Sequence, residues 1–174
     1  MIGFYIKELR VTGTGLEDAV ITLEKGLNVI NGPSNTGKSY IFKCIDYIFG
    51  AKKLKEIKES KGYEKVLLEI RNINNDKPIT LLRFINDTDD TEILYAHSHI
   101  ENFNTSNHKK LKSKHDAKAD DNISRFLLKQ IGIDENKILI KNTNGVKKTL
   151  GYRGVANLSM ISETDIISEE KSPV

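Results

Sequence analysis

The chain has 174 residues, of which 38% are hydrophobic and 29% charged, and its formal net charge is +3. These proportions are ordinary for one globular domain and exclude a wholly disordered or collagen-like chain. No apolar run approaches the roughly 18 residues of a membrane span, and the N-terminus lacks the pattern of a signal peptide. Because Cys44 is the single cysteine, we expect no internal disulfide, a reducing cytoplasmic setting and no membrane partner.

The first part of the chain predicts three strands that lead to a helix. Alternating apolar residues predict strands over 2–11 and 19–24, and a short buried strand over 27–30. From 37 to 49, apolar residues recur at i, i+3, i+4 and i+7, which is one face of a helix, and Gly50 is a natural stop.

The middle of the chain, 51–119, predicts antiparallel strands followed by a basic loop. Residues 63–73 and 78–86 alternate apolar with charged side chains and are joined by a hairpin turn, and 91–97 extends this meander. Residues 100–119 lose all periodicity and are rich in lysine, so we expect an exposed and flexible loop there.

The last part of the chain returns to regular structure. A helix is predicted over 120–131, with Asp120 or Asp121 as its N-cap. A strand over 137–142 and a second helix over 149–161 follow, and the remaining residues form a polar, acidic tail. Strands and helices of this kind predict an α/β domain.

Residues 32–39, Gly-Pro-Ser-Asn-Thr-Gly-Lys-Ser, match the phosphate-binding loop pattern GxxxxGK(S/T). Glycines let backbone N–H groups turn towards an anion, and the dipole of the following helix favours negative charge. We expect Lys38 to reach the β- and γ-phosphates, and Ser39 to supply an oxygen ligand to Mg²⁺. The predicted contact residues are Gly32, Pro33, Ser34, Asn35, Thr36, Gly37, Lys38, Ser39 and Tyr40.

The segment 26–50, GLNVINGPSNTGKSYIFKCIDYIFG, resembles the first nucleotide-binding segment of the SMC-like ABC-type ATPases. That group includes the double-strand-break-repair ATPase that partners a nuclease. Its typical features are two antiparallel strands before the phosphate loop and a helix with Ile-Asp near its end, which here is Ile45-Asp46. The resemblance implies that 1–174 form a P-loop NTPase N-lobe with an antiparallel β-subdomain and flanking helices, which binds ATP and Mg²⁺ and is incomplete without a C-terminal lobe.

Two further matches to this family concern single side chains. Residues 161–166 resemble the Q-loop segment, in which a glutamine helps hold Mg²⁺ and the attacking water; Glu163 stands at that place, so the resemblance implies a catalytic and metal-binding role for it. The family contacts adenine from the loop after the first strand, which implies Arg10 and Thr14 here. Residues 149–174 then form a helix and a Q-loop-like segment that lead to a coiled coil.

ABC-type hydrolysis also needs an apolar strand ending in Asp-Glu (Walker B) and an LSGG-like signature, and this sequence contains neither. In the family both lie in the C-terminal lobe. We therefore expect this chain to belong to an ATPase whose heads engage as a homodimer, but to bind ATP and hydrolyse little by itself. The resemblance implies a role in DNA repair, DNA maintenance or defence, with DNA and a nuclease as partners.

Two other functions stay open at this point. A small self-contained P-loop kinase or nucleotidase needs several arginines for its acceptor site and lid, whereas the chain has five in all. A non-catalytic interaction module would use the loop for regulation. The basic run 108–118 fits either contact with nucleic-acid phosphates or a solvated loop. His97 and His99 share a strand face but have no further Cys or His at zinc-ligand spacing.

Overall fold

A six-stranded antiparallel sheet is the largest element of the fold, and its strands follow the order β2-β1-β3-β4-β5-β6. The computed structural model describes residues 2–33, 36–85, 92–103, 107–133, 138–140, 145 and 147–161. The strands of the sheet are β1 (Phe4–Thr12), β2 (Ala19–Thr22), β3 (Lys65–Asn72), β4 (Pro78–Phe84), β5 (Glu92–Ala96) and β6 (Lys109–Lys112). Their order confirms the predicted antiparallel meander, with β1 and β2 joined to its first strand.

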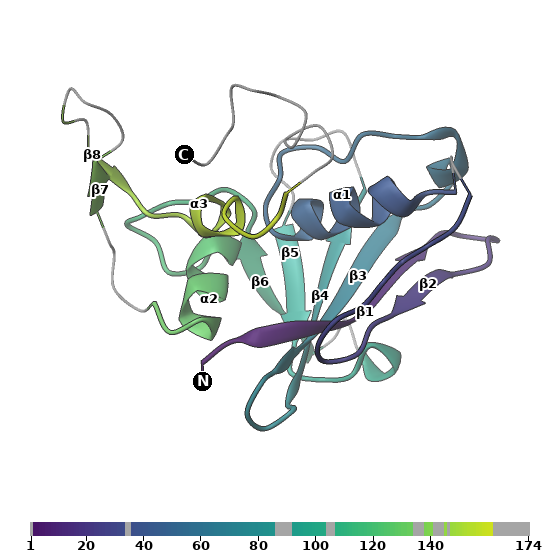
Figure 1. The fold of residues 1–174 in the computed structure, drawn as a ribbon, viewed down its shortest axis with the longest axis horizontal. Helices are drawn as coiled ribbons and strands as arrows, with labels where there is room; N and C mark the ends of the chain where they lie inside the picture. Colours follow the sequence, from purple (N-terminus) through teal and green to yellow (C-terminus); the bar gives the residue numbers. More distant parts are fainter. Residues whose placement is uncertain are drawn as a thin grey trace.

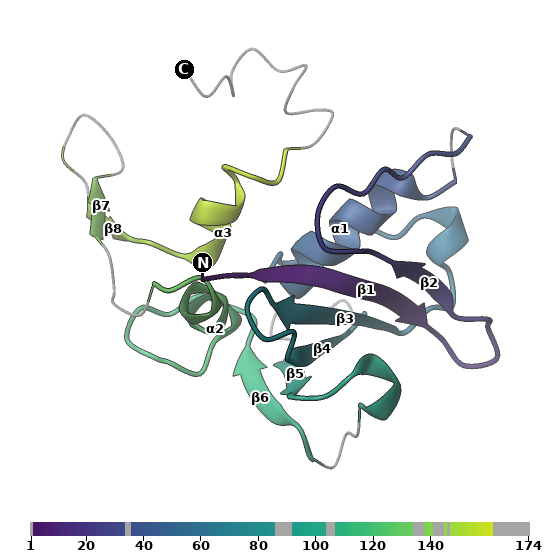
Figure 2. The ribbon, with the colours of Figure 1, turned by 60° about the horizontal axis from the view of Figure 1, so that its bottom comes forward.

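Helices cover one face and one end of this sheet (Figure 1). The helical elements are α1 (Lys38–Ile48), α2 (Ile123–Gln130), α3 (Tyr152–Ala156), and the 3₁₀ turns η1 (Lys58–Ser60) and η2 (Ile100–Asn102). In Figures 1 and 2, α1 lies along the sheet, while α2 and α3 pack together beside the start of β1. A hairpin of β7 (Ile138–Ile140) and β8 (Lys147–Thr149) lies beyond them. In the described part of the chain, no helix combines the length and the apolar character needed to cross a bilayer.

The main core lies between α1 and the sheet face that it covers. Alternate strand positions share that face, and one stripe of α1 meets them, because side chains repeat every two residues in strands and every three or four in helices. The buried members include Leu9, Val11, Val66, Leu68, Ile70, Leu81, Ile93, Cys44, Tyr47 and Ile48. This packing confirms the helix predicted over 37–49 and the inward positions of the strands that follow it.

The opposite face of the sheet carries a smaller apolar cluster. Leu67, Leu82 and Leu94 are buried there beneath Ile100 of η2. Glu69 lies on the same face and is only 2% exposed, although a charged residue at an alternating position normally faces solvent. The central strand β3 therefore buries both of its faces, which the sequence pattern alone did not predict.

The C-terminal end of α1 is fixed to β4 by two side chains. Arg83 has no exposed surface, and its Nη1 donates to the carbonyl oxygens of Tyr47 (2.5 Å) and Ala51 (2.7 Å). In the other direction, the Tyr47 hydroxyl donates to the Phe84 carbonyl at 2.6 Å. A buried cation suits this place because the carbonyl end of a helix carries partial negative charge. Burial nevertheless lowers the pKa of Arg83 from its ordinary value.

The predicted strand over 27–30 is wrong. These residues pair with no strand, and Leu27 and Val29 are 94% and 81% exposed. The side chain of Asn28 instead closes a turn, because its Nδ2 donates to the Glu24 carbonyl (2.7 Å) and its Oδ1 accepts from the Glu24 N–H (2.9 Å). A buried strand needs neighbours on both sides, and no described segment lies beside this one in a sheet.

The loop predicted over 100–119 is also more ordered than expected in its described part. β6 pairs with β5 so that Leu111 faces Ile93 and is buried, while the lysines around it stay exposed. One inward leucine between outward lysines is a short edge-strand pattern, and lysine at an edge protects it from pairing with other chains. The lysine content concealed this alternation.

The two C-terminal helices differ from prediction at their ends. Asn122, not Asp120 or Asp121, caps α2, and its Oδ1 accepts from the Arg125 N–H at 3.0 Å. The helix predicted over 149–161 is limited to α3, because β8 occupies 147–149 and the helical hydrogen bonds end near Met160.

Candidate functional site

The phosphate-loop match surrounds the N-terminal end of α1. Gly37 precedes the helix with φ +83°, a left-handed conformation that favours glycine. Its carbonyl accepts from the N–H groups of Tyr40 (2.9 Å) and Ile41 (3.2 Å), which begin the helical pattern. The N-cap residue, Gly37, has no side chain to cap this end of α1, and no side-chain cap hydrogen bond is present among the described residues. The N–H groups of the first turn and the positive end of the helix dipole are therefore available to an anion.

Lys38 folds back over the loop. Its Nζ donates to the carbonyl oxygens of Gly32 (2.7 Å) and Pro33 and lies 3.4 Å from the Thr36 Oγ1. The Thr36 hydroxyl also donates to the Pro33 carbonyl, at 2.9 Å. The loop thus surrounds the ammonium group with oxygen atoms, which is the kind of contact that phosphate oxygens make with lysine.

The remaining predicted contacts of the loop lie on both sides of Lys38. Ser39 is exposed in the first turn of α1, where its hydroxyl is accessible to a metal ion. Tyr40 is partly buried, and desolvation raises the pKa of its phenol. Ser34 and Asn35 are outside the residues that the structure describes.

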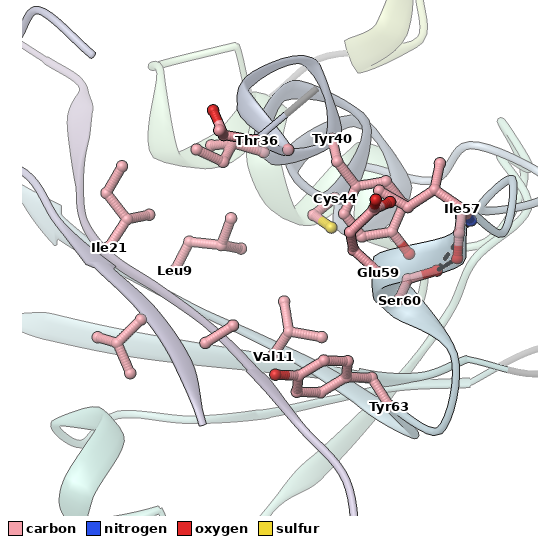
Figure 3. A pocket seen from close by; sticks show the side chains of 14 residues that line it. Leu9, Val11, Ile21, Thr36, Tyr40, Cys44, Ile57, Glu59, Ser60 and Tyr63 are labelled. Atoms are coloured by element: carbon pink, nitrogen blue, oxygen red, sulfur yellow. Dashed lines mark hydrogen bonds between the residues drawn. The ribbon is translucent and has the colours of Figure 1, made fainter. Parts of the chain in front are cut away.

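A pocket of about 440 Å³ opens beside this loop, between α1 and the strands β1 and β2 (Figure 3). Leu9, Val11 and Ile21 form its wall on the strand side. Tyr40 and Cys44, one helical turn apart, form the wall on the α1 side. Mainly apolar pockets of this size, with a few polar groups, are the usual binding places for small molecules.

The pocket and the phosphate loop share residues. Thr36 and Gly37 of the loop line the pocket at the end near the α1 N-terminus, and Tyr63 lies across it near Val11. Cys44 has no exposed surface, and burial raises the pKa of its thiol to about 12, so the sulfur stays protonated at neutral pH. It is therefore a small apolar core residue at the pocket wall.

Arg10 and Thr14 do not line this pocket. Arg10 lies on the sheet face away from α1, where its Nη2 contacts Glu8 Oε1 at 2.5 Å and Glu101 Oε1 at 3.6 Å. The Thr14 hydroxyl donates to Glu64 Oε2 at 3.2 Å in the region where β1 ends. Glu163 lies outside the described residues. The structure therefore brings together the described loop residues and Tyr40, and leaves Arg10 apart from them.

Of the pocket lining, the loop pattern had singled out Thr36, Gly37 and Tyr40 but not the apolar walls. Strand alternation places Leu9 and Val11 on one face, and helical spacing places Tyr40 and Cys44 in line, four residues apart. Those two signals were available, but they do not say that the two faces stand apart far enough to leave a pocket.

A second group of potential metal ligands lies on the opposite face of the sheet. Side-chain atoms of Glu69, His99 and Glu101 fall within 4.8 Å of one another. Arg71 already fills this place: its Nε donates to Glu69 Oε1 at 2.7 Å, and its Nη2 lies 3.3 Å from His99 Nδ1. Burial raises the pKa of Glu69, but the hydrogen bonds from Ile100 N–H and Arg71 outweigh it and leave the pKa below its ordinary value. The group is an ion-pair network centred on a buried carboxylate.

The loop and the helix that follows it have the pattern of a P-loop ATPase domain, and the antiparallel sheet is compatible with one. A comparison with known protein families agrees, because the AAA domain family matches residues 5–170. The chain therefore belongs to this family, which implies the P-loop NTPase α/β fold and suggests nucleotide binding and ATPase activity. No curated protein matches the chain.

Proposed function

We propose that this chain is the ATP-binding part of an SMC-like ATPase that acts in DNA repair, DNA maintenance or defence. The observation that carries the proposal is the open N-terminus of α1 behind a loop whose oxygens hold Lys38. The antiparallel strands β1 and β2, which precede this loop, add the feature that separates the SMC-like group from most other P-loop proteins.

The loop residues have distinct roles in this proposal. Lys38 exchanges its contacts with the Gly32 and Pro33 carbonyls for phosphate oxygens when ATP enters, so that the cation stays solvated by oxygen throughout. Gly37 starts the helix whose N–H groups face the phosphates. Ser39 and Glu163 are the proposed side-chain ligands of Mg²⁺, which neutralises phosphate charge when bound.

The exposed segment before the loop supports a second lobe as partner. Leu27, Val29 and Ile30 are 94%, 81% and 43% exposed, which is unusual for three apolar residues within four positions. We propose that strands of a C-terminal lobe carrying the Walker B strand and the signature motif cover them. Two such heads then engage as a homodimer around ATP, and hydrolysis releases them.

The other partners in the proposal follow from the resemblance to SMC-like ATPases. They are DNA and a nuclease, in the cytoplasm. Two of the three lysines of β6 contribute less free positive charge to DNA binding, because Lys110 contacts Glu92 at 2.7 Å and Lys112 contacts Asp121 at 3.1 Å. The proposal therefore assigns DNA binding to the assembled heads.

Calorimetric titration of MgATP into the chain, with phosphate release measured in parallel, tests the proposal. We expect the wild type to bind MgATP with almost no turnover, and Lys38→Ala to lose binding, because the ammonium group is the only side-chain cation within the loop sequence. A circular dichroism melt of the variant controls for folding.

Three outcomes would contradict the proposal. Equal binding by the wild type and Lys38→Ala would separate the nucleotide from the loop. Steady turnover, or phosphate transfer to a small acceptor, would identify a self-contained P-loop enzyme, and failure of the wild type to bind MgATP would favour a non-catalytic interaction module.

A further inference from the structure

The residue before the phosphate loop carries a chemistry that nucleotide binding does not use. Asn31 stands directly before Gly32, and the sequence holds two such asparagine-glycine pairs, the other being Asn144-Gly145. We propose that Asn31 is a site of spontaneous covalent modification, in which its side-chain amide becomes a carboxylate and phosphate binding by the loop is weakened. The modification is independent of the proposed nucleotide binding, whereas its effect on affinity rests on that proposed function.

The reaction needs only the chain and water. The backbone nitrogen of Gly32 attacks the side-chain Cγ of Asn31 and closes a succinimide ring. The bond between Cγ and Nδ2 breaks, and the amide nitrogen leaves as ammonia with the proton that the Gly32 nitrogen loses. Water then opens the ring at one of its carbonyls, which yields aspartate or, where the backbone continues through Cγ, isoaspartate. Nothing is oxidised or reduced in either step.

The first support is the accessibility of both reacting groups. Asn31 and Gly32 are exposed and belong to no helix or strand. Among the described residues, no hydrogen bond holds the Asn31 amide or the Gly32 N–H. Glycine also has no side chain that would obstruct the approach of its nitrogen to Cγ. Ring closure therefore requires no break in regular structure.

The second support is the contrast with other asparagines that the structure describes. Asn28 lies in the same exposed segment, but its side chain is held by backbone groups of its own turn, and a valine follows it. Asn122 has no exposed surface, caps α2 and is followed by an isoleucine. A branched side chain crowds the nitrogen that must attack, and a bonded amide cannot turn towards it. Neither restraint applies to Asn31.

The third support is the positive charge beside this pair. The Lys38 Nζ donates to the Gly32 carbonyl at 2.7 Å, so a cation lies next to the residue whose nitrogen must lose its proton. Opposite charge favours the anionic form of a nearby group, so Lys38 promotes the attack. The same cation then stabilises the carboxylate that the reaction forms.

The product competes with phosphate for this cation. A carboxylate at residue 31 lies one residue from the carbonyl that holds Lys38, and it repels the negative charges of a nucleotide. Isoaspartate also adds a methylene group to the backbone just before Gly32 and so displaces the loop. We expect the modified chain to bind MgATP about tenfold more weakly than the unmodified chain.

Peptide mass mapping after incubation of the chain in mildly alkaline buffer tests the site. A base must remove the Gly32 proton, so a sample kept in mildly acidic buffer is the reference. We expect Asn31 to show the mass change from amide to acid, with isoaspartate detected by enzymatic methylation, while Asn28 and Asn122 stay unchanged. Calorimetric titration of MgATP into the same samples should show affinity falling in parallel with the modification.

Three variants separate Asn31 from the other pair. Asn31→Gln keeps an amide but closes a larger ring more slowly, so it should keep its MgATP affinity through the incubation. Asn144→Gln removes the other asparagine-glycine pair and should lose affinity as the wild type does. Asn31→Asp carries the charge of the product from the start, so without incubation it should bind MgATP about tenfold more weakly than the wild type. A circular dichroism melt controls for the folding of each variant.

The outcomes distinguish this inference from the proposed function. An unmodified Asn31 after alkaline incubation would overturn the site, whether or not the chain binds MgATP. Wild-type affinity in the modified chain or in Asn31→Asp would overturn the effect on the loop. If the fresh wild type does not bind MgATP, the proposed function fails, and mass mapping still decides whether Asn31 is modified.

Discussion

The two ends of α1 are held in opposite ways. At its C-terminal end, Arg83 and Tyr47 tie the helix to β4, and Phe49 packs edge-on against Tyr152 with ring centroids 5.2 Å apart. At its N-terminal end, the hydrogen bonds that Lys38 makes with described residues stay within its own loop, and the segment leading to that loop exposes Leu27 and Val29.

The C-terminal end of α1 carries stabilising contacts to the sheet, whereas the N-terminal end carries the proposed phosphate-binding loop. Segments with few buried contacts open most easily, and binding groups are commonly drawn from them. The closed end of α1 provides a rigid support, so the open end can exchange its internal contacts for a ligand without unfolding the sheet. Three predictions test this contrast, in order of decreasing effect.

The largest effect is expected in the core that supports α1. Leu81 of β4 has no exposed surface and lies opposite Leu68 of β3. Leu81→Ala should lower the free energy of unfolding by about 2–5 kcal/mol, because it removes buried methyl groups and leaves a cavity. Urea unfolding followed by circular dichroism measures the change.

The same substitution at the open end is the control. Leu27 is 94% exposed, so Leu27→Ala should change the free energy of unfolding by less than about 0.5 kcal/mol. Similar losses for the two variants would show that the segment before the loop is packed after all, and the contrast between the two ends of α1 would be lost.

A smaller, pH-dependent effect is expected from Glu69 on the far face of the sheet. Its pKa is lowered in the folded state from an ordinary value of 4.5, by the Ile100 N–H and by Arg71, with His99 also facing it. A lowered carboxyl pKa gives stability that is fully present above the unfolded pKa and is lost as the pH falls through the folded one. The free energy of unfolding should therefore fall below about pH 4.5.

Glu69→Gln separates this carboxylate from the other acids. At pH 7 the variant should be less stable by about 1.5 kcal/mol, since hydrogen bonds to a charged acceptor become neutral ones. Its unfolding free energy should also depend less steeply on acid pH than that of the wild type. An unchanged acid slope would assign the pH dependence to other carboxyl groups.

The smallest effect is expected where α3 contacts α1. Arg153 Nη2 lies 3.1 Å from Asp46 Oδ2, and both side chains are partly exposed, at 50% and 31%. Exposed ion pairs of this type contribute about 0.2–1 kcal/mol. A double-mutant cycle with Asp46→Asn and Arg153→Gln should give a coupling energy in that range that disappears in 1 M salt. A larger, salt-insensitive coupling would make this pair a second anchor of α1.

Local sequence patterns predicted much of this architecture. Apolar spacing predicted α1 and its buried stripe, and alternation predicted β3, β4 and the hairpin between them. The glycine pattern predicted the loop and its position at the start of α1. These features depend on residues close together in the chain, so short-range residue spacing is enough to predict them.

Long-range packing decided the rest. The apolar pattern of residues 27–30 predicted a buried strand, but Leu27 and Val29 are exposed, because burial of a strand depends on neighbours elsewhere in the chain. The strand patterns predicted Arg83 and Glu69 as surface residues. In the structure, the carbonyls of Tyr47 and Ala51 accept from Arg83, and the Ile100 N–H donates to Glu69. A charged side chain is stable in a core only where such groups converge on it.

The amino-acid sequence by itself determined the phosphate loop, the helix behind it and the antiparallel strands, because each follows from short-range spacing and backbone preference. Only the tertiary structure decided which end of α1 is anchored, which charges are buried, and that a pocket separates Tyr40 and Cys44 from Leu9 and Val11. A pocket is a gap between two surfaces, and its width depends on how distant segments pack and not on the composition of either wall.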